Sequence, residues 1–216
     1  MAQQGQAFAN TQLLQLFPTC VWLHDLKPED YEPLNRRIAP VIRDLVSDKK
    51  PSLAGLTWQT HHDLHHEEAF AELTTYARTA ARGVLEHLQV DYSDFQITGC
   101  WANVNPQQTQ HRAHTHPNNF LSGVYYVEVP DGRDGLVFHE PRAQALVISP
   151  KVKKLSALTG SEANIEVREG RLVLFPSWLQ HSVATTRAEG ERISVSFNFM
   201  LSDYTEEFSA PRWSNR

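Results

Sequence analysis

The sequence predicts a mainly β (α+β) fold: a β-sandwich or barrel with helices in its N-terminal part. After about residue 94 the chain becomes a series of short runs rich in β-branched and aromatic residues, separated by turn formers such as "PDGRDG" and "RAEGE". About eight such runs in roughly a hundred residues are enough for a sandwich or barrel with its own core. Before residue 94, apolar residues instead recur at helical spacing.

The N-terminal part contains two candidate helices. Residues 27–48 begin with a proline and acidic residues, as helix N-termini prefer, but Pro33 and Pro40 are expected to break or kink this helix. Residues 67–90 carry one apolar stripe at spacings of three and four, which predicts a helix with a single buried face. The stripe consists of Phe70, Leu73, Ala77, Ala80, Val84 and Leu88.

The predicted strands follow one another without a linker. They cover residues 95–105, 120–129, 134–140, 145–149, 164–170, 171–176, 181–186 and 192–201. We therefore expect one domain over residues 1–216. Its parts are a mostly helical segment (1–93), a β core (94–203) and a C-terminal tail (204–216).

The composition argues against several classes of protein. The chain has 216 residues, a net charge of −5 and no basic tract, so nucleic acid is not an expected partner. There is no pattern typical of a signal peptide, and no apolar run approaches the roughly 18 residues that a membrane helix needs. Two cysteines cannot form a disulfide framework. We expect a cytoplasmic protein without a membrane partner.

Histidine is the unusual feature of the composition. Seven of the eleven histidines fall in two clusters, residues 61–66 and 111–116. Within a strand, His114 and His116 would point to the same face and could bind one metal ion. His181 begins a late strand after a turn that contains proline, where a barrel could bring it to this pair. The alternative is a polar pair of loop histidines.

Arg192 and Ser194 share one face of the last predicted strand. A guanidinium in a β-rich core needs an anionic partner, because an unpaired buried charge is costly. A ligand carboxylate could bind it in a bidentate manner, and an internal salt bridge to one of the 25 acidic residues is the alternative.

These motifs resemble the iron(II)/2-oxoglutarate (2OG) dioxygenase superfamily. The order "WANVN … HTHP … SGVYYV … FPSWLQHSV … RISVSFN" is similar to an uncharacterised bacterial and phage-associated subgroup of 2OG-Fe(II) oxygenases, over roughly residues 95 to 200. The resemblance implies a double-stranded β-helix (a cupin-like jelly roll) braced by the N-terminal helices. It also implies a reaction in which decarboxylation of 2OG to succinate is coupled to hydroxylation of a C–H bond by O2.

The resemblance also implies roles for individual residues. The metal ligands would be His114, His116 and His181, holding Fe(II), with no catalytic group beyond them. Arg192 would bind the distal carboxylate of 2OG with help from Ser194 and Tyr126. For Tyr126, a core position with its hydroxyl at the rim is the alternative. Asn103, on one strand face with Trp101 and Asn105, is expected to line the floor of the co-substrate pocket.

One position departs from the family pattern. His116 stands where the wider superfamily has Asp or Glu. Three-histidine iron sites occur in related cupin-like dioxygenases, and Glu140 as third ligand is a less favoured alternative. The leading hypothesis is a 2OG-Fe(II) oxygenase acting on a substrate that the sequence does not identify. The alternatives are a cupin-like three-histidine metalloenzyme that does not use 2OG, and a non-catalytic jelly-roll binding module.

The remaining histidines are expected to have no site role. His61, His62, His65 and His66 are interpreted as surface histidines and His111 as a solvent-exposed loop residue, with a place beside the ligands or facing substrate as its alternative. Jelly rolls often pair through edge strands, so a homodimer is one expectation for the assembly.

Overall fold

The computed structural model describes residues 9–47, 57–130, 135–156, 158–185 and 189–204. It contains two α-helices, α1 (Pro28–Leu45) and α2 (Ala71–His87). The strands are β1 (Trp22–Asp25), β2 (Trp58–Gln59), β3 (Phe95–Asn105), β4 (His111–His114), β5 (Leu121–Glu128), β6 (Gly135–His139), β7 (Glu162–Glu166), β8 (Arg171–Pro176), β9 (His181–Val183) and β10 (Arg192–Leu201). Short 3-10 helices cover Leu64–His66, Glu68–Phe70 and Ala143–Leu146.

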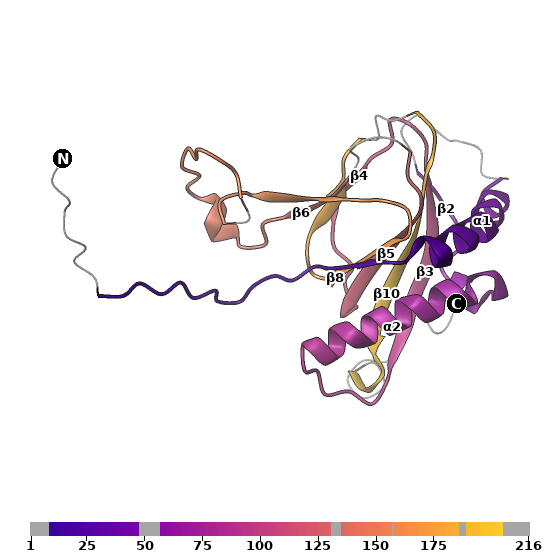
Figure 1. The fold of residues 1–216 in the computed structure, drawn as a ribbon, viewed down its shortest axis with the longest axis horizontal. Coiled ribbons are helices and arrows are strands. Elements are labelled where there is room, and N and C mark those ends of the chain that lie inside the picture. The colour runs from indigo at the N-terminus through magenta and orange to yellow at the C-terminus, as the bar shows by residue number, and fades with distance from the viewer. Residues whose placement is uncertain (1–8, 48–56, 131–134, 157, 186–188, 205–216) are drawn as a thin grey trace.

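Strands β3 to β10 form a double-stranded β-helix. The larger sheet has the order β1-β8-β5-β10-β3-β2 and the smaller one β4-β9-β6-β7, with antiparallel pairing throughout (Figure 1). The chain passes back and forth between the two sheets, so strands far apart in sequence become neighbours. The predicted jelly roll braced by N-terminal helices is confirmed. Of the predicted strands, 95–105, 171–176 and 192–201 have the predicted bounds.

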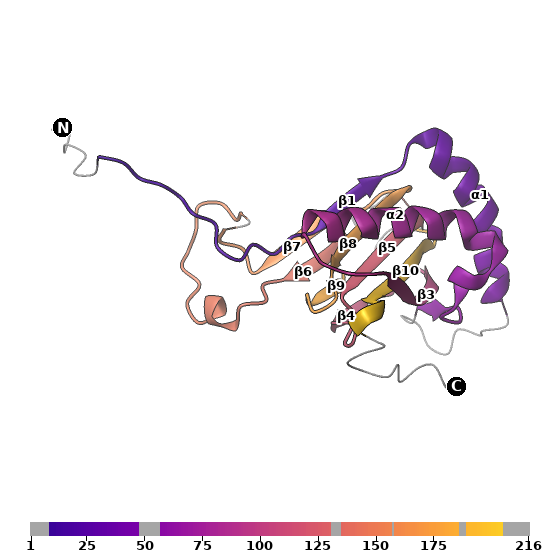
Figure 2. The same cartoon turned by 90° about the horizontal axis from the view of Figure 1, so that it is seen from below.

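Both helices lie on one side of the larger sheet, and the smaller sheet lies on its other side (Figure 2). The main core fills the layer between the helices and the larger sheet, where Ile38 and Val84 meet Phe197 and Phe199. A buried polar link crosses this layer: the Tyr125 hydroxyl donates to Asn35 Oδ1 (2.7 Å), and Asn35 Nδ2 donates to the Val127 carbonyl (2.7 Å). This link fixes α1 against β5.

Strand β5 separates two cores. Tyr125 and Val127 face the helices, whereas Val124 and Tyr126 face the interior of the jelly roll, because alternate residues of a strand point to opposite sides. The interior core includes Phe138, Val173 and Phe175. The candidate site lies beside this second core.

The N-terminal part differs from the prediction in two ways. Pro33 and Pro40 were expected to break or kink α1; the break is wrong, because one helix continues through both prolines. Its apolar face packs into the main core, and this burial outweighs the loss of two backbone hydrogen bonds. The segment also contributes β1 and β2, which the helical prediction missed, as edge strands of the larger sheet.

Two further predictions concern one predicted strand and the C-terminal tail. Residues 145–149 ("ALVIS") form no strand; they lie in the β6–β7 loop, where Leu146, Val147 and Ile148 are exposed. An apolar run alone does not supply a strand partner, which explains the error. Of the predicted tail (204–216), only Tyr204 is among the described residues.

Neither α-helix in the described part of the chain is long and apolar enough to cross a membrane.

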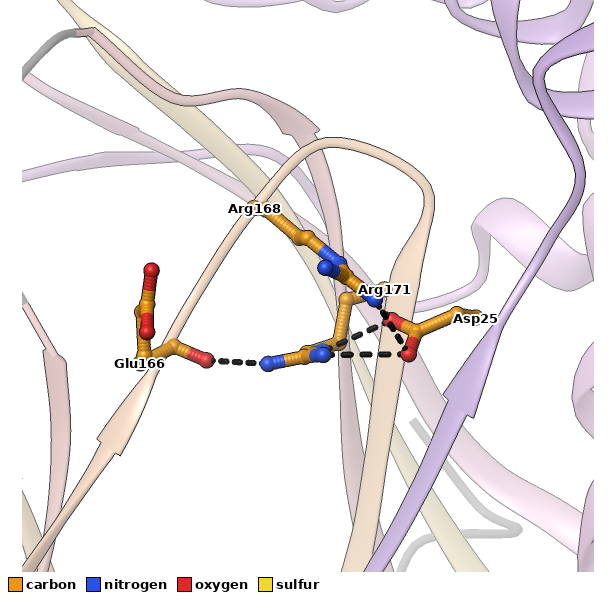
Figure 3. Close-up of polar contacts among 4 residues, drawn as sticks. All are labelled: Asp25, Glu166, Arg168 and Arg171. Atoms are coloured by element: carbon orange, nitrogen blue, oxygen red, sulfur yellow. Dashed lines mark hydrogen bonds and ion pairs between the residues drawn. The ribbon is translucent and has the colours of Figure 1, made fainter.

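A cluster of ion pairs joins β1 to the turn between β7 and β8 (Figure 3). The Asp25 carboxylate accepts hydrogen bonds from Arg168 (2.7 and 3.2 Å) and from Arg171 (2.7 and 3.0 Å). Arg171 also donates to the carbonyl of Glu166 (2.6 Å). The two guanidinium groups, Arg171 foremost, hold the pKa of Asp25 well below its usual range. The cluster attaches the edge strand β1 to its neighbours.

The turn before β8 requires glycine at position 170. Gly170 has a φ of +76°, and an added Cβ would lie 2.4 Å from Tyr31 Cδ1. We expect Gly170→Ala to lower the free energy of unfolding by about 1–3 kcal/mol, because strain in the left-handed region adds to the clash. Urea denaturation followed by circular dichroism measures this. The control is Gly83→Ala in α2, where nothing lies within 4 Å and a gain of about 0.5–1 kcal/mol is expected.

Candidate metal centre and co-substrate pocket

Three histidines from two distant parts of the chain meet in one pocket of the jelly roll. His114, His116 and His181 offer ligand nitrogens that all lie within 4.8 Å of one another, and no other group of three such residues occurs in the described part of the chain. His116 Nε2 and His181 Nε2 are 3.3 Å apart. Two nitrogens bound to one ion at ~2.1 Å, at right angles, lie about 3 Å apart, so the cluster matches a single metal site.

The backbone explains how the three side chains converge. Strands β4 and β9 pair with His114 opposite His181. The predicted shared strand face for His114 and His116 is wrong in detail, because β4 ends at His114. His116 lies in the following turn, where its amide donates to the carbonyl of Ser177 (2.9 Å) rather than to a strand partner. The turn, not strand alternation, directs His116 to the site.

Hydrogen bonds fix the orientation of two imidazoles. His114 Nδ1–H donates to the Arg112 carbonyl (2.8 Å), and His181 Nδ1–H donates to the Leu179 carbonyl (2.9 Å). A carbonyl only accepts, so Nδ1 carries the proton and Nε2 keeps its lone pair. This arrangement is typical of metal-binding histidines, whose other ring nitrogen donates to a neighbouring acceptor.

Burial keeps two of the three histidines, His116 and His181, neutral. It lowers the pKa of His116 to about 4, with His114 contributing, and the pKa of His181 to about 3. The ring of His181 also packs against Phe175, with ring centroids 4.6 Å apart. Neutral imidazole is the form that binds metal, so these residues are ready to act as ligands at neutral pH.

A buried polar chain supports the turn that follows β8. Ser177 donates to the Ser122 hydroxyl (2.8 Å), which donates to Asn198 Oδ1 (2.8 Å). All three residues are buried. The Ser177 carbonyl is the acceptor for the His116 amide. The chain therefore connects β5 and β10 to the backbone of His116, and no sequence motif indicated it.

The pocket next to the histidines contains the predicted co-substrate residues. Arg192, Ser194 and Tyr126 are each at most 5% exposed and line this pocket. Ser194 lies opposite Tyr126 in the pairing of β10 with β5. Burial raises the pKa of Tyr126 to about 12, against the opposing effect of Arg192, so its hydroxyl is a hydrogen-bond donor at neutral pH.

The floor of the pocket comes from alternate residues of β3. Trp101, Asn103 and Asn105 all line it, as the shared strand face predicts. Asn103 accepts from Gln59 Nε2 (2.8 Å) and donates to the Ser196 hydroxyl (3.0 Å). Its amide is thus engaged by the protein on both sides.

His111 was expected to be a solvent-exposed loop residue, and this is wrong. It lies in β4, half-buried, and lines the same pocket. Its Nε2 contacts Thr57 Oγ1 (2.7 Å) and Asn105 Nδ2 (3.3 Å). Burial and the nearby Arg192 guanidinium lower its pKa to about 4. Its spacing of three from His114 concealed this position, since alternation within a regular strand would put the two on opposite faces; the register of β4 shifts between them.

Neither Glu140, the alternative third ligand, nor the histidines of the 61–66 cluster belong to the metal site. The Glu140 carboxylate is bound by Arg142 (2.8 and 2.9 Å), which lowers its pKa to about 2, and it does not line the pocket. In the 61–66 cluster, His61 pairs with Glu67 (2.8 Å) and the exposed His62 stacks on Trp101, with ring centroids 4.7 Å apart. These four histidines belong to no three-ligand group among the described residues.

Comparison with protein families gives one match. Residues 99–198 match the family model described as "Putative 2OG-Fe(II) oxygenase". The matched segment runs from β3 to β10 and contains all three clustered histidines and Arg192. No curated protein sequence matches the chain.

Solved structures share the fold at low sequence identity. A prolyl-4-hydroxylase from Pseudomonas putida is 19% identical, with a TM-score of 0.57, over 85% of this chain and 93% of that chain. HygX from Streptomyces hygroscopicus, with nickel, 2-oxoglutarate and hygromycin B bound, is 13% identical, with a TM-score of 0.58, over 85% and 84%. The 2OG-dependent epimerase SnoN from nogalamycin biosynthesis is 12% identical, with a TM-score of 0.58, over 78% and 72%.

Proposed function

We propose that this chain, in which residues 99–198 make up a 2OG-Fe(II) oxygenase domain, binds Fe(II) through His114, His116 and His181 and 2OG through Arg192. The observation that carries the proposal is that three imidazoles and one buried guanidinium line a single pocket. The imidazoles suit a first-row metal ion, and the guanidinium suits a carboxylate. Few ligands other than a metal-chelating diacid would use both.

The chain holds the co-substrate by its two ends. One end of 2OG, with its keto and carboxylate oxygens, would chelate the ion beside the histidines. The other carboxylate would accept a bidentate pair of hydrogen bonds from Arg192, with Tyr126 and Ser194 as further donors. When bound, Fe(II) supplies the activation of O2 that couples decarboxylation of 2OG to oxidation of a second substrate.

The other residues of the site shape the pocket. Phe175 and Leu136 provide apolar walls beside His181, which limit the access of water. Three neutral ligands leave the charge of the ion at +2, so the dianionic co-substrate provides the neutralisation that a ligand carboxylate would otherwise share. The metal ion and Arg192 would then each bind one carboxylate of 2OG with a positive charge. A site with His116 in place of an acid therefore still suits 2OG.

The test is succinate formation by the purified chain. With Fe(II), 2OG and O2, we expect slow release of succinate even without a second substrate, and none when any of the three is left out. Calorimetry on the chain loaded with Ni(II), which does not turn over, should show 2OG binding. If iron binds but 2OG neither binds nor yields succinate, the cupin-like reading replaces this one. If no metal binds, the jelly roll is a binding module.

A further inference from the structure

Exposed apolar side chains are concentrated in two segments away from the pocket. One is an N-terminal arm, residues 9–20, which forms no helix or strand; the other is the β6–β7 loop over residues 140–156. Together they hold eight of the thirteen exposed large apolar side chains of the described residues. These eight are Leu13, Leu14, Leu16, Phe17, Leu146, Val147, Ile148 and Leu155. A monomeric soluble protein rarely leaves so much apolar surface in one region open to water.

Both segments project from the same end of the molecule. Figures 1 and 2 show the arm and the loop extending beyond the two sheets on one side, away from α1. The arm nevertheless does not bury its side chains against its own loop, since Leu13 is 78% and Phe17 is 95% exposed. On the loop, Val147 is 78% and Ile148 is 79% exposed. Two apolar surfaces therefore lie near each other without covering each other.

We infer that the chain forms a two-fold dimer in which the arm of each copy packs on the β6–β7 loop of the other. Each copy carries one arm and one loop. A two-fold axis pairs both arms with both loops at once, so no arm or loop stays exposed for a further copy. At roughly 100 Å² of apolar area each, the eight side chains supply on the order of 800 Å² per copy. A stable interface needs about this area from each partner.

Charge favours contact between arm and loop over contact between two loops. The loop carries Lys151, Lys153 and Lys154, all exposed, so two loops placed together would repel. The arm has no charged residue between positions 9 and 20. An uncharged apolar arm can therefore lie on a basic loop without the cost of bringing like charges together.

The test is the mass of the full chain in solution. Sedimentation equilibrium at micromolar concentrations should give twice the 24.6 kDa of one copy. The arm variant Leu13→Ser/Leu16→Ser/Phe17→Ser and the loop variant Val147→Ser/Ile148→Ser should each raise the dimer dissociation constant by more than ~100-fold. Leu88→Ser, at an exposed apolar position after α2, should leave the dimer unchanged.

Mixing the two variants tests exchange between copies. The arm variant has an intact loop and the loop variant has an intact arm, so the mixture should form a dimer held by one of the two contacts, with affinity between those of the wild type and the single variants. The inference is overturned if the wild type stays at the mass of one copy, or if both variants remain fully dimeric. It is also overturned if the variants keep their dimer and lose only substrate turnover, because the surface would then bind substrate. Urea unfolding of each variant confirms that the fold is retained.

Discussion

Replacing His181 with alanine is expected to abolish succinate formation and to weaken Fe(II) binding by more than about 100-fold, the upper range for loss of a group that merely supports a ligand. His181 is 5% exposed, its Nδ1–H is held by the Leu179 carbonyl, and its ring lies within 5.1 Å of that of His116 (centroid to centroid). Without it, only two of the three ligands remain, His114 at the end of β4 and His116 just after that strand. Metal analysis after gel filtration, together with the succinate assay, measures both effects.

The matched control for this change is His66→Ala, at an exposed histidine outside the pocket, which should keep full metal content. A second variant, His116→Asp, places the acid of the wider family in the cluster and should still bind iron, because a carboxylate suits the same ion. Metal content in His181→Ala equal to that of the wild type would contradict the assignment of the ligands. Unfolding curves separate loss of metal from loss of fold.

Replacing Arg192 with leucine is expected to raise the KM for 2OG by about 100- to 1,000-fold, equivalent to about 3–4 kcal/mol for a lost pair of charge-assisted hydrogen bonds. The metal content should not change, since Arg192 lies outside the three-histidine cluster. Arg192→Lys keeps the charge but not the planar fork, so its KM should lie between the two. Steady-state kinetics over a range of 2OG concentrations measure the effect.

The control for this change is Arg36→Leu, at an arginine on the exposed face of α1 that pairs with Glu32 (3.6 Å). Its KM should match that of the wild type. If Arg192→Leu lost iron together with affinity for 2OG, the residue would be supporting the fold of the site rather than binding the co-substrate. An unchanged KM would place the distal carboxylate elsewhere in the pocket.

Much of the fold follows from local pattern. The strands 95–105, 171–176 and 192–201 were predicted with the observed bounds, because β-branched and aromatic residues there are flanked by clear turns. The errors occur where tertiary packing, not local sequence, determines whether a segment forms a helix or a strand. Pro33 and Pro40 are accommodated because α1 packs against the sheet, and "ALVIS" is no strand because no partner lies beside it in the described structure. The four residues of β1 are too few to be recognised without β8.

The site was predictable only where the order of residues along the chain carries the signal. The order of His114, His116, His181 and Arg192 along the sequence indicated the metal and co-substrate groups, and the structure brings them to one pocket. His111 was misplaced because its contacts, Thr57 and Asn105, come from other strands or loops. The hydrogen bonds that hold the turn of His116 likewise depend on three-dimensional contacts, which single-sequence patterns do not contain.

The ion pairs of Asp25 fix the register of the short edge strand β1 against β8. Its half-buried Trp22 and His24 alternate with the exposed Leu23 and Asp25, so a slip of one residue against β8 would turn Trp22 and His24 to solvent. A slip of two residues would keep the same faces, and apolar pattern alone does not oppose it. Such a slip would, however, move Asp25 by about 7 Å along β8, away from Arg168 and Arg171. One carboxylate thus selects a single alignment and sets the point at which the arm leaves the sheet.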